Sequence, residues 1–449
     1  MRIRIGKIMR RAAIIAGLIL LTALAALTAD TPAQRLFDRL RGKVLDDMVK
    51  VPRYTCVETV TRHQYRPQVP LRATTCAGVI TARAALTSPG VLTWHDRLRL
   101  DVAVGADSEM FSWAGARAFD TKDLDTLTAS GSSGSGDFAS FLGSVFGGAA
   151  EHFVYQGEKD TPLGRLTMFE YNVPLAKSHY SYRTGNGAKG ITGYHGAFYA
   201  IPATAELRRL VVEATEFASG NVCRVLDTMD YQRAKIGSGD YILPEVSRME
   251  VLYTDGEESQ NETHYSGCHE FTGESTIRFD DPDEPNSAAA EAKAELQALP
   301  PKTHIRVRID PPIDSLIAAA GDPITGVVES EVKQKGKVLV RTSDRLHGRV
   351  LRLEQFMFPD PHWLVAIRFD SIERDGVEQP VSLKPADDGD RTGQRVQQTP
   401  GLGRRGAPTM STAAALPTPE RPPGGGVFIL PGTGNLVLDR KFHSEWETK

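Results

Sequence analysis

The chain has 449 residues, of which 41% are hydrophobic and 24% charged, and its formal net charge is -3. This composition is that of folded globular material and excludes a wholly disordered chain, while the length suits two domains with connecting segments. The slightly negative net charge argues against nucleic acid as a partner, because nucleic-acid binding needs a concentrated basic surface.

Residues 1–29 have the layout of a secretory signal peptide, with a basic start, the apolar stretch AAIIAGLILLTALAALTA and small residues at its end. Cleavage after Ala25 fits the small-residue rule best, cleavage after Ala29 is the alternative, and an uncleaved N-terminal anchor is the competing interpretation. Removal of the segment takes away five basic residues, so the net charge changes from -3 to -8. The five are Arg2, Arg4, Lys7, Arg10 and Arg11.

No cysteine follows the apolar stretch, so a lipoprotein anchor is not expected there. No later segment approaches the ~20 apolar residues that a transmembrane helix needs. The sequence therefore predicts a periplasmic or secreted protein with no transmembrane segment after signal cleavage.

An amphipathic helix is predicted over residues 30–50. Its apolar residues recur at steps of three and four, which gives the helix one buried face, and Pro52 ends it. The apolar residues are Leu36, Phe37, Leu40, Val44, Leu45, Met48 and Val49.

Residues 51–280 change to alternating apolar and polar residues, as in YTCVETVTRHQY, RLRLDVAV and ELRRLVVEAT. Turn sequences such as TDGEES and KIGSGD separate these stretches, and long helices do not intervene. The region is predicted to form an antiparallel β domain.

Within this domain, GSGDFASFLGSVFGG predicts a short helix between glycine-rich flanks. Ser135 or Asp137 is positioned to cap its start. The helix is either a fixed part of the core or a lid over an apolar cavity. The candidate ligand-binding residues are Trp113, Phe138, Phe141, Leu142, Val145 and Phe146.

The stretch HYSGCHEFTGEST (His264–Thr276) concentrates groups that bind metals or carry out catalysis. His269-Glu270 begins like the zinc motif H-E-x-x-H, but Gly273 stands where the second histidine is required. The alternation instead predicts a strand in which Cys268 points inward to a disulfide, while His269 and Glu274 face solvent. No metal or cofactor is expected.

Four further segments complete the chain. Residues 281–300 are predicted to be a linker that holds a short helix, and residues 301–381 a small β-barrel module. Residues 382–426 are rich in Gly, Pro, Thr and Arg and are predicted to be a disordered insertion. Residues 427–449 regain strand character and are expected to complete the second domain.

The chain has four cysteines, Cys56, Cys76, Cys223 and Cys268. An even number in an exported protein predicts disulfides, and a four-cysteine zinc site would need C-x-x-C pairs that this sequence lacks. Three connectivities are possible. The simplest joins Cys56 to Cys76 and Cys223 to Cys268.

Residues 300–357 resemble the small β-barrel module of the conjugation-protein (TrbI/VirB10-like) type. Arg341-Thr342-Ser343-Asp344 departs from the Pro-x-Gly turn usual at that point. The resemblance implies a fold and no activity. The matching residues are Ile305, Val307, Ile309, Ile313, Ser315, Ala320-Gly321-Asp322, Gly326, Val338 and Gly348-Arg349.

The first β domain is similar to the open β-barrels of lipoprotein carriers (LolA/RseB-like), through MFSWAGARAFD, RLTMFEYNVP and GYHGAFYAIPATAELRRLVV. In the last segment, Phe198 and Ile201 flank a turn at Pro202. The resemblance implies a curved sheet that cradles acyl chains and a short helix that plugs its mouth. The whole chain also resembles secreted bacterial proteins for which no function is established.

The predicted fold class is mainly β, an antiparallel curved sheet (open half-barrel) with helices, plus a second small β-barrel domain. The leading functional hypothesis is non-catalytic binding of a lipid or lipoprotein acyl chain in the first domain. An envelope scaffold that binds proteins is the alternative, and a hydrolase with a dispersed active site is a third hypothesis. No catalytic motif supports an enzyme.

Overall fold

The structure is a computed structural model that describes residues 31–70, 73–105, 109–116, 119, 124, 127–128, 131–134, 136–183, 189–218, 220–271, 299–386 and 425–449. The predicted signal peptide lies outside the described residues, as do most of the predicted linker and most of the predicted insertion. Glu274 also lies outside them.

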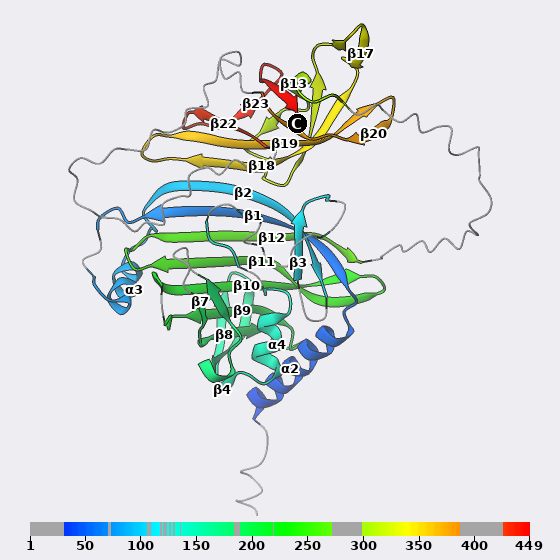
Figure 1. Cartoon of the computed structure of the whole chain (residues 1–449). Coiled ribbons are helices and arrows are strands. Elements are labelled where there is room, and N and C mark those ends of the chain that lie inside the picture. Colours follow the sequence, from blue (N-terminus) through cyan, green and yellow to red (C-terminus); the bar gives the residue numbers. More distant parts are fainter. Residues whose placement is uncertain are drawn as a thin grey trace, which may run out of the picture.

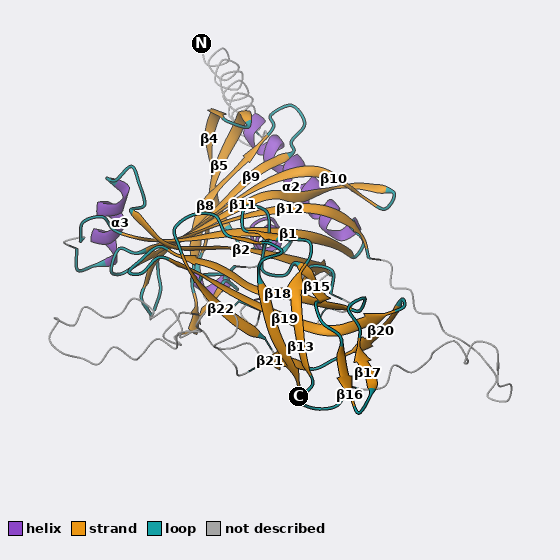
Figure 2. Ribbon diagram, turned by 90° about the horizontal axis from the view of Figure 1, so that it is seen from above, coloured by secondary structure: helices purple, strands orange, loops and turns teal. Residues whose placement is uncertain are grey.

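The predicted mainly β fold, an antiparallel curved sheet with helices, is confirmed (Figures 1 and 2). The large sheet is not closed into a barrel. Its first part is formed by the region that alternates in the sequence. The strands of this region are β1 (Tyr54–Arg66), β2 (Val91–Val104), β3 (Glu109–Trp113), β4 (Glu151–Thr161), β5 (Gly164–Val173), β6 (Ser181–Arg183), β7 (Lys189–Ile191), β8 (Tyr194–Ala200), β9 (Leu207–Ala214), β10 (Val222–Ile236), β11 (Gly239–Tyr253) and β12 (Glu258–Glu270).

The strands of the first region pair in the order β4, β5, β8, β9, β10, β11, β12, β1, β2, with β3 beside the end of β2. All of these pairs are antiparallel, as short connections allow. The predicted strand around Cys268 is β12, which lies between β11 and β1.

The second region surrounds a core of its own that includes Ile305, Val365 and Trp446. It also continues the ladder of the first region, because β18 pairs with β2 through Gln355 opposite His95. Its strands are β13 (His304–Ile309), β14 (Ile313–Asp314), β15 (Pro323–Val328), β16 (Val332–Gln334), β17 (Lys337–Val340), β18 (Arg345–Phe356), β19 (His362–Arg374), β20 (Val377–Pro380), β21 (Leu383–Pro385), β22 (Gly426–Pro431), β23 (Val437–Leu438) and β24 (His443–Thr448).

Charged side chains are buried where the two regions meet. The Arg62 guanidinium of β1 donates to both carboxylate oxygens of Asp96 on β2, at 2.8 and 2.5 Å, and both side chains are about 2% exposed. Trp94 Nε1 donates to Glu354 of β18 at 3.1 Å. These buried polar groups have hydrogen-bond partners only when β1, β2 and β18 are aligned as described. They therefore fix the register of the β2–β18 junction, which we call the β2–β18 seam.

Two helices cover one face of the sheet at its β5–β10 end (Figure 1). Helix α2 (Pro32–Lys50) begins at Thr31, whose hydroxyl caps the helix, and buries the apolar stripe that periodicity predicts. Helix α4 (Ser140–Gly147) lies beside it. A third helix, α3 (Cys76–Ala84), packs against β10.

The local disulfide pairing expected from the sequence is wrong. Cys56 is joined to Cys268, and Cys76 is joined to Cys223. The sheet register explains the first bond, because β1 and β12 are neighbours and a bulge at this point brings the two cysteines opposite each other. The packing of α3 against β10 explains the second.

Candidate functional site

The sheet presents a set of aromatic side chains to α2 and α4. We call Phe169 and Tyr171 of β5 with Tyr194 and Phe198 of β8 the aromatic face. The rings of Phe169 and Phe198 stack with their centroids 5.2 Å apart. All four side chains are buried, so the two helices shield an aromatic surface from water.

Four of the predicted site residues lie together on α4, and all four are buried against this face. They are Phe141, Leu142, Val145 and Phe146. The Phe146 ring meets Phe198 edge-on at 5.1 Å, and the Phe141 ring meets Tyr180 at 5.1 Å. The helical spacing from the sequence is therefore reproduced for these residues.

The other two predicted site residues lie elsewhere. Phe138 precedes α4 and packs edge-on against Tyr54 and Tyr265, in a separate cluster over β1 and β12. Trp113 is partly buried beside the same cluster, at the end of β3. Phe138 is outside the helix because α4 begins only at Ser140.

The expected side-chain cap of α4 is also wrong where the structure describes it. The residue at the cap position is Ala139, which makes no side-chain hydrogen bond to the helix. Asp137 instead directs its carboxylate to the Tyr265 hydroxyl of β12. Helix α4 is thus short and has no side-chain cap at its N-terminus, although the Gly148 amide donates to the Ser144 carbonyl at its C-terminus, and such a helix depends on packing for its stability.

Glycines stand on both sides of α4. Gly136 has a φ of +107° and Gly148 a φ of +122°, conformations that other residues rarely adopt. A Cβ atom added at Gly148 would meet no neighbouring atom within 4 Å. Glycine at these positions therefore allows the chain to turn at each end of α4 without steric strain.

A glycine–serine segment precedes α4 and lies across the sheet. We call residues 131–134 and 136–139 the strap. At its first end, the Ser132 carbonyl accepts from Asn261 Nδ2 at 3.0 Å and from Arg62 Nη1 at 3.4 Å. The Ser132 hydroxyl meets that of Ser259 at 2.5 Å. The strap therefore connects the buried Arg62–Asp96 pair to α4.

Acidic groups hold the other end of the strap. The amide of Gly136 donates to Glu109 Oε2 at 3.0 Å. The Tyr231 hydroxyl donates to the Asp137 carbonyl at 2.9 Å. Glu109 Oε1 is shielded from solvent, and among the described groups it has no hydrogen-bond partner of ordinary geometry. The backbone amides of Gly136 and Phe138 both favour the ionised form of this carboxyl.

Burial shifts the titration of these acids. It raises the pKa of Glu109 to about 7, and the neighbouring Asp137 adds to that shift. Burial also raises the pKa of Glu58 well above its ordinary value, with Glu109 and Asp137 contributing. We call Glu58, Glu109 and Asp137 the carboxyl cluster. Its acids disfavour each other's ionised form.

A fourth acid, Asp227 on β10, accepts from the Tyr180 hydroxyl at 2.9 Å. Burial raises its pKa to about 8, and Asp137 adds to the shift. The folded chain therefore binds this proton more tightly than the unfolded chain does. The resulting stabilisation is present at acid pH and is lost as pH rises toward 8.

Asp227→Asn is expected to raise the free energy of unfolding at pH 8.5 by roughly 1–3 kcal/mol, because the amide keeps the Tyr180 hydrogen bond and cannot ionise. The gain should be smaller at pH 5 and should vanish only below the ordinary carboxyl pKa of 3.8, where the acid is protonated in both the folded and the unfolded chain. Urea unfolding followed by circular dichroism at both pH values measures this. Asp160→Asn, at an exposed position on β4, is the matched control and should change neither value. Equal stabilities of Asp227→Asn and the parent at pH 8.5 would contradict the prediction.

Sequence reasoning did not find the carboxyl cluster. The burial of one member could have been predicted. Glu58 alternates with Cys56, Val60 and Arg62, so it must share their inward face. Glu109 and Asp137 carry no comparable pattern. They influence the pKa of Glu58 only when β3 and the strap lie on the sheet.

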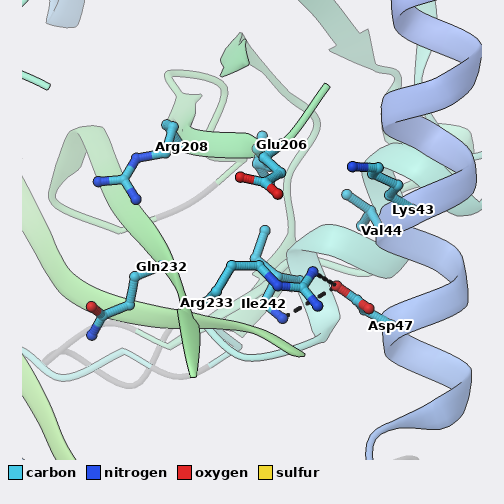
Figure 3. Close-up of a pocket in the computed structure, with 9 residues that line it drawn as sticks. Lys43, Val44, Asp47, Glu206, Arg208, Gln232, Arg233 and Ile242 are labelled. Atoms are coloured by element: carbon cyan, nitrogen blue, oxygen red, sulfur yellow. Dashed lines mark hydrogen bonds and ion pairs between the residues drawn. The ribbon is translucent and has the colours of Figure 1, made fainter. Parts of the chain in front are cut away.

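A hollow of about 330 Å³, part of it open solvent, lies between α2 and strands β9–β11 (Figure 3). Asp47 of α2 accepts from Arg233 Nη1 at 2.6 Å and from the Ile242 amide at 3.3 Å. Lys43 donates to the Thr204 carbonyl at 2.7 Å. These contacts attach α2 to the sheet, so we assign the hollow a structural role.

Within the described ranges, no three histidine, cysteine or acidic side chains gather closely enough to hold a metal ion. The helices of that part of the chain also include none with the length and apolarity to cross a bilayer. Disulfides are typical of proteins that fold in oxidising, extracytoplasmic compartments.

Comparison with known proteins gives two structural likenesses. A DUF1329 family protein from Desulfovibrio piger has a TM-score of 0.26 and 13% identity over 56% of this chain and 98% of its own. A LolA superfamily protein from Nitrosomonas europaea has a TM-score of 0.22 and 12% identity over 55% of this chain and 96% of its own. TM-scores this low carry no argument about ligand or activity.

No protein-family model matches the sequence, and no curated protein matches it either. The resemblance of residues 300–357 to the TrbI/VirB10-like module therefore stays a prediction.

Proposed function

We propose that this protein binds an apolar ligand, such as a lipid or a lipoprotein acyl chain, on the aromatic face after α4 moves aside. The proposal rests on the way in which α4 covers that face. An eight-residue helix without a side-chain cap, flanked by glycines of positive φ, shields four buried aromatic side chains. The proposed role is non-catalytic.

The physical argument concerns the removal of α4. Helices shorter than about 12 residues are marginal in water, so α4 has little stability apart from its packing. Displacing it exposes Phe141 and Phe146 together with the face beneath. A ligand that buries comparable apolar surface compensates for this exposure, since the free energy of burial scales with apolar area.

A cross-link between α2 and α4 tests the proposal. Gly143 of α4 lies against the end of Met48 of α2, where an added Cβ would be 3.3 Å from Met48 Cε. Met48→Cys with Gly143→Cys can be joined by a short bis-maleimide, because the native cysteines are held in disulfides. We expect the cross-linked protein to lose at least about tenfold in affinity for a fluorescent fatty acid.

The same double variant, with each thiol capped separately by N-ethylmaleimide, is the matched control and should bind as the parent does. Circular dichroism must show both forms folded. Equal affinities of the cross-linked and capped forms would exclude displacement of α4. Native mass spectrometry of the detergent-free protein adds a direct readout, because a bound mass that releases lipid identifies the ligand class.

A second candidate is an envelope scaffold that binds other proteins and holds no small molecule. The specific observation in its favour is the pairing of β2 with β18, which joins both regions into one ladder with buried ion pairs. A scaffold of this kind would be rigid. A detergent-free protein that carries no ligand and takes up no fluorescent fatty acid would favour this candidate.

The proposed location is the periplasm or the outside of the cell. It is supported by the basic and apolar start of the sequence and by the two disulfides. Mass determination of the N-terminus of exported protein would establish whether cleavage follows Ala25 or Ala29.

A further inference from the structure

Three exposed aliphatic side chains lie together in the second region, beside the paired strands β14 and β23. Leu316 and Ile317 follow β14, and Val437 belongs to β23. Their exposed fractions are 57%, 71% and 51%, and we call these three residues the apolar tip. The Ser315 amide donates to the Leu436 carbonyl and the Leu436 amide to the Ser315 hydroxyl, both at 2.9 Å. The two segments are therefore held side by side where they leave the strand pair.

The backbone of the apolar tip at Leu316 and Ile317 has all of its hydrogen-bonding groups paired. The Leu316 amide donates to the Asp314 carboxylate at 2.9 Å, and the Ile317 amide donates to the Asp314 carbonyl at 3.0 Å. Arg97 Nη1 donates to the Leu316 carbonyl at 2.7 Å, and Arg99 Nη2 donates to the Ile317 carbonyl at 3.1 Å. These two residues can therefore leave water without an unpaired backbone group, which is the requirement for entry into the apolar part of a bilayer.

The small size of the apolar tip favours a lipid surface over a protein partner. A stable protein interface buries about 800 Å² on each partner, and its core is enriched in aromatic side chains. Three aliphatic side chains supply much less area and no ring. A bilayer needs no complementary shape, because membrane binding increases with whatever apolar area is inserted.

The charge beside the apolar tip suits phosphate head groups. Arg99 is paired with Asp322, whereas Arg97 forms no ion pair within the described ranges. The Arg97 side chain is partly exposed, and a guanidinium has more donors than the one that the Leu316 carbonyl uses. The Asp314 carboxylate is turned to the Leu316 amide. Arg97 is therefore free to donate to a lipid phosphate while the aliphatic side chains insert.

We propose that the apolar tip docks the protein on a phospholipid membrane, with Leu316, Ile317 and Val437 inserted and Arg97 at the head groups. The inference goes beyond the proposed function, because it assigns an interaction surface in the second region. It requires neither a ligand on the aromatic face nor movement of α4.

A fluorophore on the apolar tip tests insertion directly. Val437→Cys can be labelled with the environment-sensitive dye NBD, because all four native cysteines are in disulfides. With vesicles of phosphatidylethanolamine and phosphatidylglycerol, we expect its emission to shift to shorter wavelength and to rise severalfold. Leu175→Cys carries the control dye on the exposed 3-10 turn Leu175–Lys177 of the first region, and its emission should not change. Attachment through residues 1–29 would leave the dye at position 437 in water.

Vesicle flotation of unlabelled protein measures the contribution of one side chain. Leu316→Asp should lower the affinity for these vesicles at least about tenfold, because burial of one leucine side chain corresponds to about that factor. Leu175→Asp is the matched control, since Leu175 is also 57% exposed, and it should bind as the parent does. Circular dichroism must show both variants folded, as expected for changes at exposed positions.

Unchanged emission at position 437 on addition of vesicles would overturn the inference, and so would a Leu316→Asp variant that binds vesicles as tightly as the parent. Self-association that is lost in Leu316→Asp, without vesicle binding, would also overturn it, because the apolar tip would then join copies of this chain. Sedimentation velocity measures that association. Uptake of the fluorescent fatty acid should be equal in Leu316→Asp and the parent, so failure of docking and failure of the proposed function are separate results.

Discussion

Arg62→Met is expected to lower the free energy of unfolding by about 3–5 kcal/mol, because it leaves Asp96 as a buried charge without its ion-pair partner. The same change removes the guanidinium from above the Trp94 ring and from the Ser132 carbonyl of the strap. Urea unfolding at pH 7, followed by circular dichroism, measures the loss.

The double variant Arg62→Met with Asp96→Leu should recover most of this loss, because buried ion pairs can be replaced by apolar side chains with little effect. Arg165→Met removes one partner of an exposed ion pair on β5 and is the matched surface control, with no measurable change expected. If Arg62→Met were as stable as the parent, Asp96 would have to find another partner or become hydrated. The β2–β18 seam would then not depend on the Arg62–Asp96 pair.

Removal of either disulfide should lower the free energy of unfolding by about 3–5 kcal/mol, because each bond closes a very long loop and restricts the unfolded chain. The bonded cysteines are 212 residues apart for Cys56–Cys268 and 147 apart for Cys76–Cys223. Loop entropy depends on the logarithm of length, so the two losses should differ by only about 0.3 kcal/mol. Paired cysteine-to-alanine variants test this in the same unfolding assay.

Peptide mapping without reduction checks the connectivity independently of stability. Proteolysis should release the peptide of Cys56 linked to that of Cys268, and the peptide of Cys76 linked to that of Cys223. A peptide that joins Cys56 to Cys76 would contradict the antiparallel register of β1 and β12 from which the pairing follows.

Local pattern predicted the elements that short-range physics decides. The stripe from Leu36 to Val44 recurs at helical steps, and α2 buries it. Alternation through Tyr54–Arg66 marks β1, and its inward positions are the buried ones. Helix α3 was missed because only Val79 of its nine residues is buried, which leaves almost no amphipathic signal.

The candidate site was predicted only in part. Phe141 and Val145 are four residues apart on the same helix, and so are Leu142 and Phe146, so spacing alone put each pair on one face. Phe138 fits the same spacing but lies outside α4, because Tyr54 and Tyr265 provide a separate aromatic pocket for its ring. Glu58, Glu109 and Asp137 are more than 20 residues apart from each other, and no local pattern links them.

The sequence by itself determined the strand-rich composition, the helical and the alternating periodicity of its segments, and the residues of α4 that face a core. Those properties depend on neighbours a few positions away, and periodicity records them directly. The tertiary structure decided which cysteines pair, that β2 and β18 share a ladder, and that Glu109 accepts from the Gly136 amide of the strap. Each of these depends on contacts between segments far apart in the sequence, and the register of the paired strands is set by the packing of whole strands on both faces of the sheet.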